Sequence, residues 1–61
     1  MYSYRCYCLD RTGHIEDVEF IECDDEDQVR ERVGELLRQR VKFSSIEAWY
    51  RDRMIVRLPR I

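Results

Sequence analysis

Three cysteines and one histidine are the side chains of this chain that could bind a soft metal ion: Cys6, Cys8, Cys23 and His14. Thiolates and an imidazole in this number could form a tetrahedral zinc site if the fold brought them together. A hairpin that pairs Cys6 with Val18 places Cys6 five residues from Cys23 along the strands. At about 3.3 Å per residue, this distance is about 16 Å. We therefore expect no metal site and no disulfide, and we expect three thiols that pack as small hydrophobic groups.

Acidic residues cluster at positions 22–27, which raises the question of a calcium site. The cluster lacks the glycine and the downstream glutamate of an EF-hand loop. A helix start accounts for it instead, because acids stabilise the positive end of a helix dipole. His14 has no serine or cysteine nucleophile beside it in the expected hairpin, and no glycine-rich phosphate loop occurs. We expect no catalytic residue and no cofactor, so the chain is predicted not to be an enzyme.

Arginines close to aromatic residues in the last part of the chain suggest a second kind of chemistry, contact with nucleic acid through charge and base stacking. The residues that could make such contacts are Arg51, Arg53, Arg57 and Arg60, near Trp49 and Tyr50. Residues 1–29 carry nine acids and two bases, whereas residues 30–61 carry four acids and nine bases. The isoelectric point of about 5.3 argues against a nucleic-acid surface. A nucleic-acid-associated regulatory protein remains the alternative hypothesis.

The length of 61 residues predicts a single domain over 1–61. Domains this small usually add disulfides, a metal or a partner subunit to reach sufficient stability. Because the first two are not expected, self-association is favoured. No apolar run approaches the roughly 20 residues that span a bilayer, and no signal peptide is recognisable. The expected location is cytoplasmic, without membrane contact.

Hydrophobic periodicity and turn residues predict four strands and one helix. We expect strands at about 2–9, 14–23, 45–50 and 54–58, and a helix at about 25–41. The fold class is therefore α+β, with two antiparallel hairpins in one sheet and a single helix on one face (β-β-α-β-β).

The first hairpin can be registered from its turn. Residues 10–13 suit a type I turn in which Gly13 takes the left-handed conformation. The predicted pairs are then Leu9 with Ile15, Cys6 with Val18, and Tyr4 with Phe20.

The second hairpin is expected to have a three-residue loop, Arg51 to Arg53. The predicted pairs are Tyr50 with Met54, Trp49 with Ile55, Ala48 with Val56, Glu47 with Arg57, and Ile46 with Leu58. In this register Arg53 would have to adopt the left-handed conformation.

The helix is predicted to begin at Asp24 as N-cap, with Asp27 three residues later as in a capping box. One helical stripe is apolar and should cover one face of the sheet. The predicted core combines Val29, Val33, Leu36 and Leu37 with Tyr4, Cys6, Val18, Phe20, Ile46, Ala48, Val56 and Leu58.

The other face of the sheet is expected to lack a cover, yet it is half apolar. Its predicted members are Tyr7, Leu9, Ile15, Ile21, Trp49 and Ile55, bordered by Arg5, Asp17, Glu19, Glu47 and Arg57. A solvent-exposed face of an antiparallel sheet should be polar, and apolar patches usually mark interaction sites. We expect a homodimer formed through this face or through an adjoining edge strand.

Three segments resemble a family of small uncharacterised bacterial proteins, chiefly from proteobacteria. They are L-D-R-T-G-H-I (9–15), I-E-C-D-D-E-D (21–27) and I-E-A-W-Y-R-D-R (46–53). The shared pattern is L-D-x-x-G-x-I, an acidic helix start, and I-E-x-W-x-x-x-R. This resemblance implies the fold and transfers no functional residue, because no activity is assigned to the family. The leading hypothesis is a non-enzymatic interaction module that self-associates.

Overall fold

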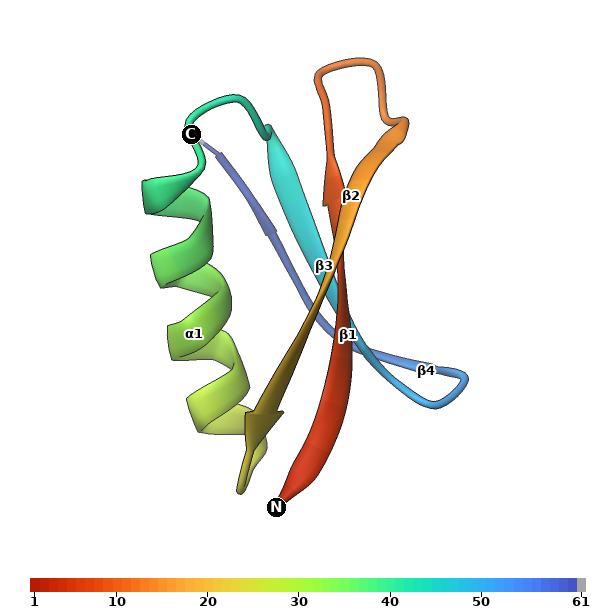
Figure 1. Ribbon diagram of the computed structural model, residues 1–61, viewed down its shortest axis with the longest axis vertical. Helices are drawn as coiled ribbons and strands as arrows, with labels where there is room; N and C mark the ends of the chain where they lie inside the picture. The colour runs from red at the N-terminus through yellow and green to blue at the C-terminus, as the bar shows by residue number, and fades with distance from the viewer. Residues whose placement is uncertain (61) are drawn as a thin grey trace.

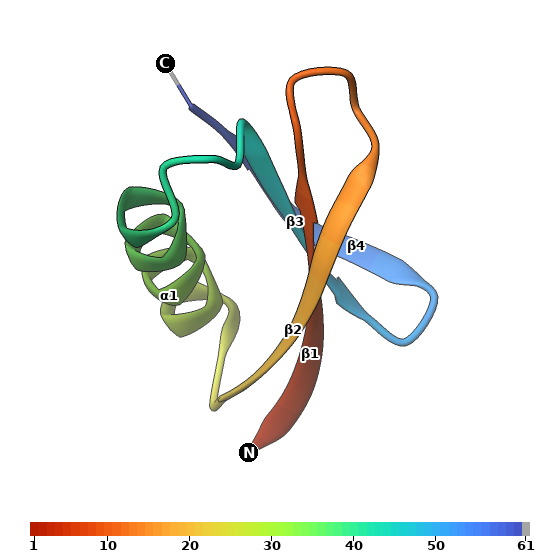
Figure 2. The same cartoon turned by 45° about the horizontal axis from the view of Figure 1, so that its top comes forward.

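The computed structural model describes residues 1–60 as a four-stranded antiparallel sheet with one helix on one side (Figures 1 and 2). The elements are β1 (Tyr2–Leu9), β2 (Ile15–Cys23), α1 (Glu26–Gln39), β3 (Ser45–Tyr50) and β4 (Arg53–Pro59). The strand order is β2-β1-β3-β4, so the two hairpins are joined by pairing of β1 with β3. The predicted α+β class and β-β-α-β-β order are confirmed. Within residues 1–60, α1 lacks the length and apolarity of a bilayer-spanning helix.

The turn of the first hairpin has the predicted geometry. The Asp10 carboxylate accepts hydrogen bonds from the Thr12 N–H at 2.8 Å, the Thr12 hydroxyl at 2.6 Å and the His14 N–H at 3.1 Å. Gly13 has a φ of 88°, a conformation that glycine adopts without steric cost. Leu9 pairs with Ile15, as expected.

Beyond this pair the predicted register is wrong by one residue. A β-bulge lies next to Leu9, because β2 contains one residue more than β1 at this point. Cys6 therefore faces Glu19 instead of Val18, and Tyr4 faces Ile21 instead of Phe20. A shift of one residue transfers every side chain to the opposite face of the strand.

The bulge exchanges the inner and outer residues of β2. Val18 and Phe20, predicted to lie in the core, are 40% and 68% exposed. Ile21, predicted to lie on the uncovered face, is only 5% exposed and belongs to the core.

The shifted register also places Asp17 and Glu19 on the helix side. There the Arg40 guanidinium lies 2.6 Å from the Glu19 carboxylate and 4.0 Å from that of Asp17. These contacts join the end of α1 to β2.

The second hairpin has a shorter loop than predicted. Its turn residues are Arg51 and Asp52, and Arg51 rather than Arg53 takes the positive φ, at 57°. Near the turn, Tyr50 pairs with Arg53 and Trp49 with Met54, so two predicted pairs are wrong. A second bulge, at Ile55, restores the predicted register for the rest of the hairpin.

Helix α1 is shorter than predicted by about one residue at the start and two at the end. Its N-cap is Asp25, whose carboxylate accepts the N–H of Gln28 at 2.9 Å, and not Asp24. The Gln28 side chain in turn accepts the N–H of Asp24 at 2.9 Å. The helix ends before Arg40, whose extended ψ of 83° interrupts the helical conformation.

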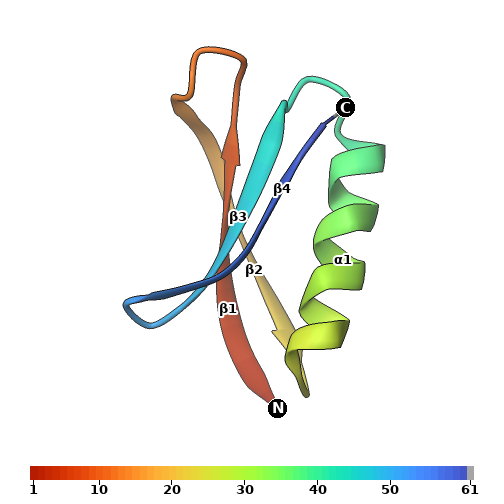
Figure 3. The same ribbon diagram turned by 180° about the vertical axis from the view of Figure 1, so that it is seen from behind.

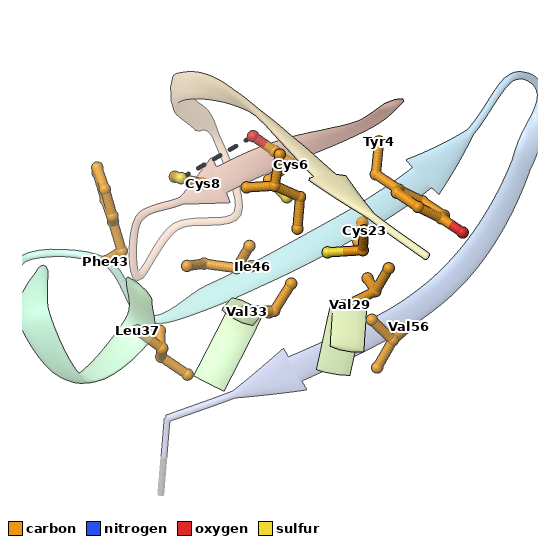
Figure 4. Packing of buried hydrophobic residues seen from close by; sticks show 12 residues of the cluster. Tyr4, Cys6, Cys8, Cys23, Val29, Val33, Leu37, Phe43, Ile46 and Val56 are labelled. Atoms are coloured by element: carbon orange, nitrogen blue, oxygen red, sulfur yellow. Dashed lines mark hydrogen bonds between the residues drawn. The ribbon is translucent and has the colours of Figure 1, made fainter. Parts of the chain in front are cut away.

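The core lies between α1 and the sheet (Figure 4). Val29 and Val33 are completely buried, Leu37 is nearly so, and Phe43 from the following loop fills the end of the core. Leu36 and Leu58, predicted to be central, are only partly buried at its margin. The remaining buried hydrophobic residues are Tyr4, Cys6, Cys8, Ile21, Cys23, Ile46, Ala48 and Val56.

Candidate interaction surface

We call the side of the sheet opposite α1 the open face. Antiparallel partners lie on the same face, so the register defines transverse rows of neighbouring side chains. One row is Phe20, Arg5, Trp49 and Met54, and the next is Val18, Tyr7, Glu47 and Arg57. No described segment of the chain crosses this side of the sheet (Figures 1 and 3).

The open face exposes large apolar side chains. Phe20 is 68% exposed, Ile15 is 58% exposed and Met54 is 46% exposed, and Val18 lies beside them. Tyr7, Leu9 and Trp49 are partly buried. The exposed apolar residues come from both edge strands, and Tyr7 and Trp49 lie between them on the central strands.

Seven of the eleven residues predicted for this face or its border are brought together: Tyr7, Leu9, Ile15, Trp49, Arg5, Glu47 and Arg57. The other four are not. Ile21 is in the core, and Ile55 lines a hollow of about 290 Å³ on the helix side with Tyr2, Tyr4, Glu26, Tyr50 and Arg53. Asp17 and Glu19, expected at its border, also lie on the helix side.

Val18, Phe20 and Met54 are the residues of the open face that sequence reasoning missed. They were assigned to the opposite face because β2 and β4 each contain a β-bulge. No glycine in the sequence marks either inserted residue. An alternation pattern shows which residues share a face but not where the alternation shifts.

Arg5 lies near the centre of the open face, paired with Phe20 on one side and with Trp49 on the other. One of its terminal amino groups donates to the Arg51 carbonyl, and the guanidinium lies 5.8 Å from the centroid of the Tyr7 ring. Its Nε atom is buried and has no hydrogen-bond partner among the described residues. A buried donor without a partner costs about 1–3 kcal/mol.

Glu47 supplies the negative charge of the same surface. Its carboxylate accepts a hydrogen bond from the Trp49 indole at 3.2 Å and lies 3.8 Å from the Arg57 guanidinium. This hydrogen bond holds the indole beside an acid. The open face carries both signs of charge within two rows.

The four arginines of the nucleic-acid hypothesis do not form one cluster. Arg57 lies on the open face beside Glu47, whereas Arg53 lies 3.7 Å from Glu26 at the start of α1. The Arg51 guanidinium lies over the Tyr50 ring, at 5.4 Å from its centroid.

Arg60 contacts the chain at the end of α1. Its guanidinium donates to the carbonyls of Leu37, Arg40 and Phe43, the last at 2.9 Å. These are carbonyls at and beyond the end of α1, which a helix leaves without internal partners. Arg60 therefore joins the last strand to the helix terminus.

The cysteines lie in the core, where their thiols are held protonated. Burial, with smaller effects of Cys8 and Cys23, raises the pKa of the Cys6 thiol to about 12. Burial followed by the charges of Glu19 and Asp17 raises the pKa of the Cys8 thiol to about 11, and burial also raises the pKa of Cys23. The thiolate is the form that attacks electrophiles and binds metals, so these environments favour neither reaction.

No group of three or more histidine, cysteine or acidic residues within residues 1–60 is close enough to hold a metal ion. The His14 ring lies at the exposed turn, with Nδ1 2.8 Å from the Thr12 hydroxyl. Independence from metal stays a prediction, and elemental analysis of the purified protein tests it.

Comparison of the chain with protein-family models, with curated proteins and with solved structures gives no match.

Proposed function

We propose that this protein is a non-enzymatic interaction module that binds a second copy of itself through the open face. The observation that carries the proposal is the exposure of Phe20, Ile15, Met54 and Val18 on one uncovered side of the sheet. An antiparallel sheet that faces water on one side normally presents polar residues there. Extended apolar patches on small domains are typical of interfaces.

The charges of the open face support a second copy as the partner. Glu22 also lies on the open face, paired with Ser3. A two-fold axis through the face can bring Arg5 and Arg57 of one protomer towards Glu47 and Glu22 of the other, because an isologous interface pairs a surface with itself. The exposed end of the Arg5 guanidinium then meets a carboxylate of the other copy. Aromatic residues and arginine are the typical anchors of such interfaces.

The dimensions of the molecule are sufficient for this interface. A stable interface buries about 800 Å² on each partner, which is roughly a fifth of the 4469 Å² accessible surface of the chain. The molecule measures 31 Å along its longest axis, and the strands that form the open face run roughly along this axis (Figure 1). Two sheets packed in this way form a sandwich with an apolar layer between them.

Sedimentation equilibrium of Trp49→Glu tests the proposal. The substitution places a charge in the middle of the open face, and we expect it to convert a dimer into a monomer with unchanged far-ultraviolet circular dichroism. High salt is used, because it screens associations that depend on surface charge. Apolar association through the open face persists under these conditions.

Val41→Glu is the matched control. Val41 is 80% exposed and lies in the loop after α1, so the same apolar-to-acid change occurs away from the open face. We expect this variant to remain a dimer. A wild-type monomer at high micromolar concentration, or equal dissociation of both variants, would contradict the proposal.

A further inference from the structure

The strand order leaves two edges of the sheet free. β2 pairs only with β1, and β4 pairs only with β3. Each edge strand therefore presents a row of backbone N–H and C=O groups without strand partners. The two edge strands lie at opposite sides of the molecule: β2 is in front of the other strands in Figure 1, and β4 is in front in the reverse view of Figure 3.

The two edges carry opposite charge. β2 contains four acids and no base, namely Glu16, Asp17, Glu19 and Glu22. β4 contains Arg53 and Arg57 and no acid. Like charges across a strand pair are destabilising, so pairing of β2 with β2, or of β4 with β4, is disfavoured. Pairing of β2 with β4 of another copy is the combination that the charges favour.

The strand directions fit the same combination. Each neighbouring pair in the sheet is antiparallel, so β2 and β4 run in opposite directions. A second copy displaced sideways along the sheet, without being turned over, places its β2 antiparallel to β4 of the first. Both copies then keep α1 on the same side, and the sheet continues without interruption.

We propose that β4 of one protomer pairs with β2 of a second copy of this chain. Extending the transverse rows sideways places Met54 beside Phe20 of the second copy, an apolar pair on the open face. Arg53 lies diagonally opposite Glu19 of the second copy. Cross-strand pairs of these kinds each contribute about 0.2–1 kcal/mol.

This contact is heterologous, because different surfaces of the two copies meet. Each added copy leaves one free β2 edge and one free β4 edge, so association continues until a ring closes or the array stays open. The edge contact is therefore distinct from the two-fold contact through the open face. It does not depend on the proposed function, and it predicts species larger than a dimer.

A charge-exchange experiment tests the edge contact. All chains carry Trp49→Glu, so that the open face does not contribute, and sedimentation velocity is recorded at low salt. The first variant adds Glu16→Arg and Glu22→Arg, which cancels the net negative charge of the β2 edge and leaves the β4 edge basic. The second adds Arg53→Glu and Arg57→Glu, which makes both edges acidic.

We expect the Trp49→Glu chain to form species above twice its mass of 7.6 kDa as concentration rises, and to lose them at high salt. Each charge-reversed variant alone should be monomeric. An equal mixture should form one-to-one pairs, because the first variant keeps its basic β4 edge and the second keeps its acidic β2 edge. Circular dichroism reports folding, and if either double reversal unfolds, the single reversals Glu16→Arg and Arg53→Glu replace them.

Two results would overturn the edge contact. A Trp49→Glu chain that stays monomeric at all concentrations would show that β2 and β4 of different copies do not pair. Association that survives both reversals would place the contact elsewhere. A wild-type dimer that Trp49→Glu dissociates completely would retain the open-face proposal while removing this one.

Discussion

Phe20 and Trp49 flank Arg5 in one transverse row of the open face, although they come from strands that the sequence separates by the entire helix. The pairing of β1 with both β2 and β3 brings them to the same level. They lie on the strands either side of Arg5, whose Nε has no hydrogen-bond partner among the described residues. This row connects the apolar and the charged components of the proposed interface.

Two phenylalanines test the register directly. Phe43 is 1% exposed and Phe20 is 68% exposed. We expect Phe43→Ala to lower the free energy of unfolding by about 3–5 kcal/mol, enough to abolish cooperative unfolding of so small a domain. Phe20→Ala should change it by less than about 1 kcal/mol, because surface positions contribute little. Urea denaturation at low protein concentration measures both free energies. A larger loss for Phe20→Ala than for Phe43→Ala would favour the register without a bulge.

Arg5→Gln tests whether the Arg5 guanidinium meets an acid of a second copy. We expect the dimer dissociation constant to rise about tenfold or more, as for a central arginine anchor. Arg11→Gln, in the exposed turn of the first hairpin, is the charge-matched control and should leave the constant unchanged. Equal dissociation constants for wild type and Arg5→Gln would remove Arg5 from the interface.

The buried thiols predict a loss of stability in alkali. The pKa of Cys6 is raised to about 12 and that of Cys8 to about 11, whereas an unfolded cysteine ionises at about 8.5. Above that pH the unfolded chain releases protons that the folded chain retains. Below about pH 8, these thiols should therefore not change the free energy of unfolding. Above it, the free energy of unfolding should fall by about 1.4 kcal/mol per pH unit for each thiol.

Cys8→Ala separates this effect from other ionisations. Its free energy of unfolding should fall less steeply between pH 9 and about 11 than that of the wild type. A wild-type free energy that stays constant across this range would show that the thiols are less buried than the structure indicates.

Arg60 should contribute to stability through the end of α1. Arg60→Ala removes the donors to the carbonyls of Leu37, Arg40 and Phe43, and we expect a loss of about 1–3 kcal/mol in the free energy of unfolding. Arg60→Lys should recover only part of this loss, since an ammonium group cannot present the planar set of donors. An unchanged melting temperature for Arg60→Ala would exclude this structural role.

Local sequence signals predicted the elements well. The Asp10–Gly13 turn, the acidic start of the helix and the apolar stripe each depend on residues close in sequence. The class and element order followed from them, as did the pairs from Ile46–Leu58 to Ala48–Val56 of the second hairpin.

Which side chains of β2 and of the start of β4 lie on the helix side of the sheet could not be predicted in the same way. Each depends on a bulge, and no glycine or other turn residue marks the extra residue at Glu16 or Ile55. Phe20 is as apolar as a core residue, so its position outside the core follows from the pairing of the whole strand. A half-apolar uncovered face was therefore predicted from the sequence, but Val18, Phe20 and Met54 were missing from it.

The fluorescence of Trp49, the single tryptophan of the chain, tests self-association through the open face most directly. Trp49 is partly buried in one protomer and central to the proposed interface. At high salt, we expect its emission maximum to shift to shorter wavelength as concentration rises from nanomolar to high micromolar, with acrylamide quenching falling in parallel. The midpoint should match the dissociation constant from sedimentation. Emission and quenching that stay constant while the mass doubles would place the dimer contact elsewhere and contradict the account.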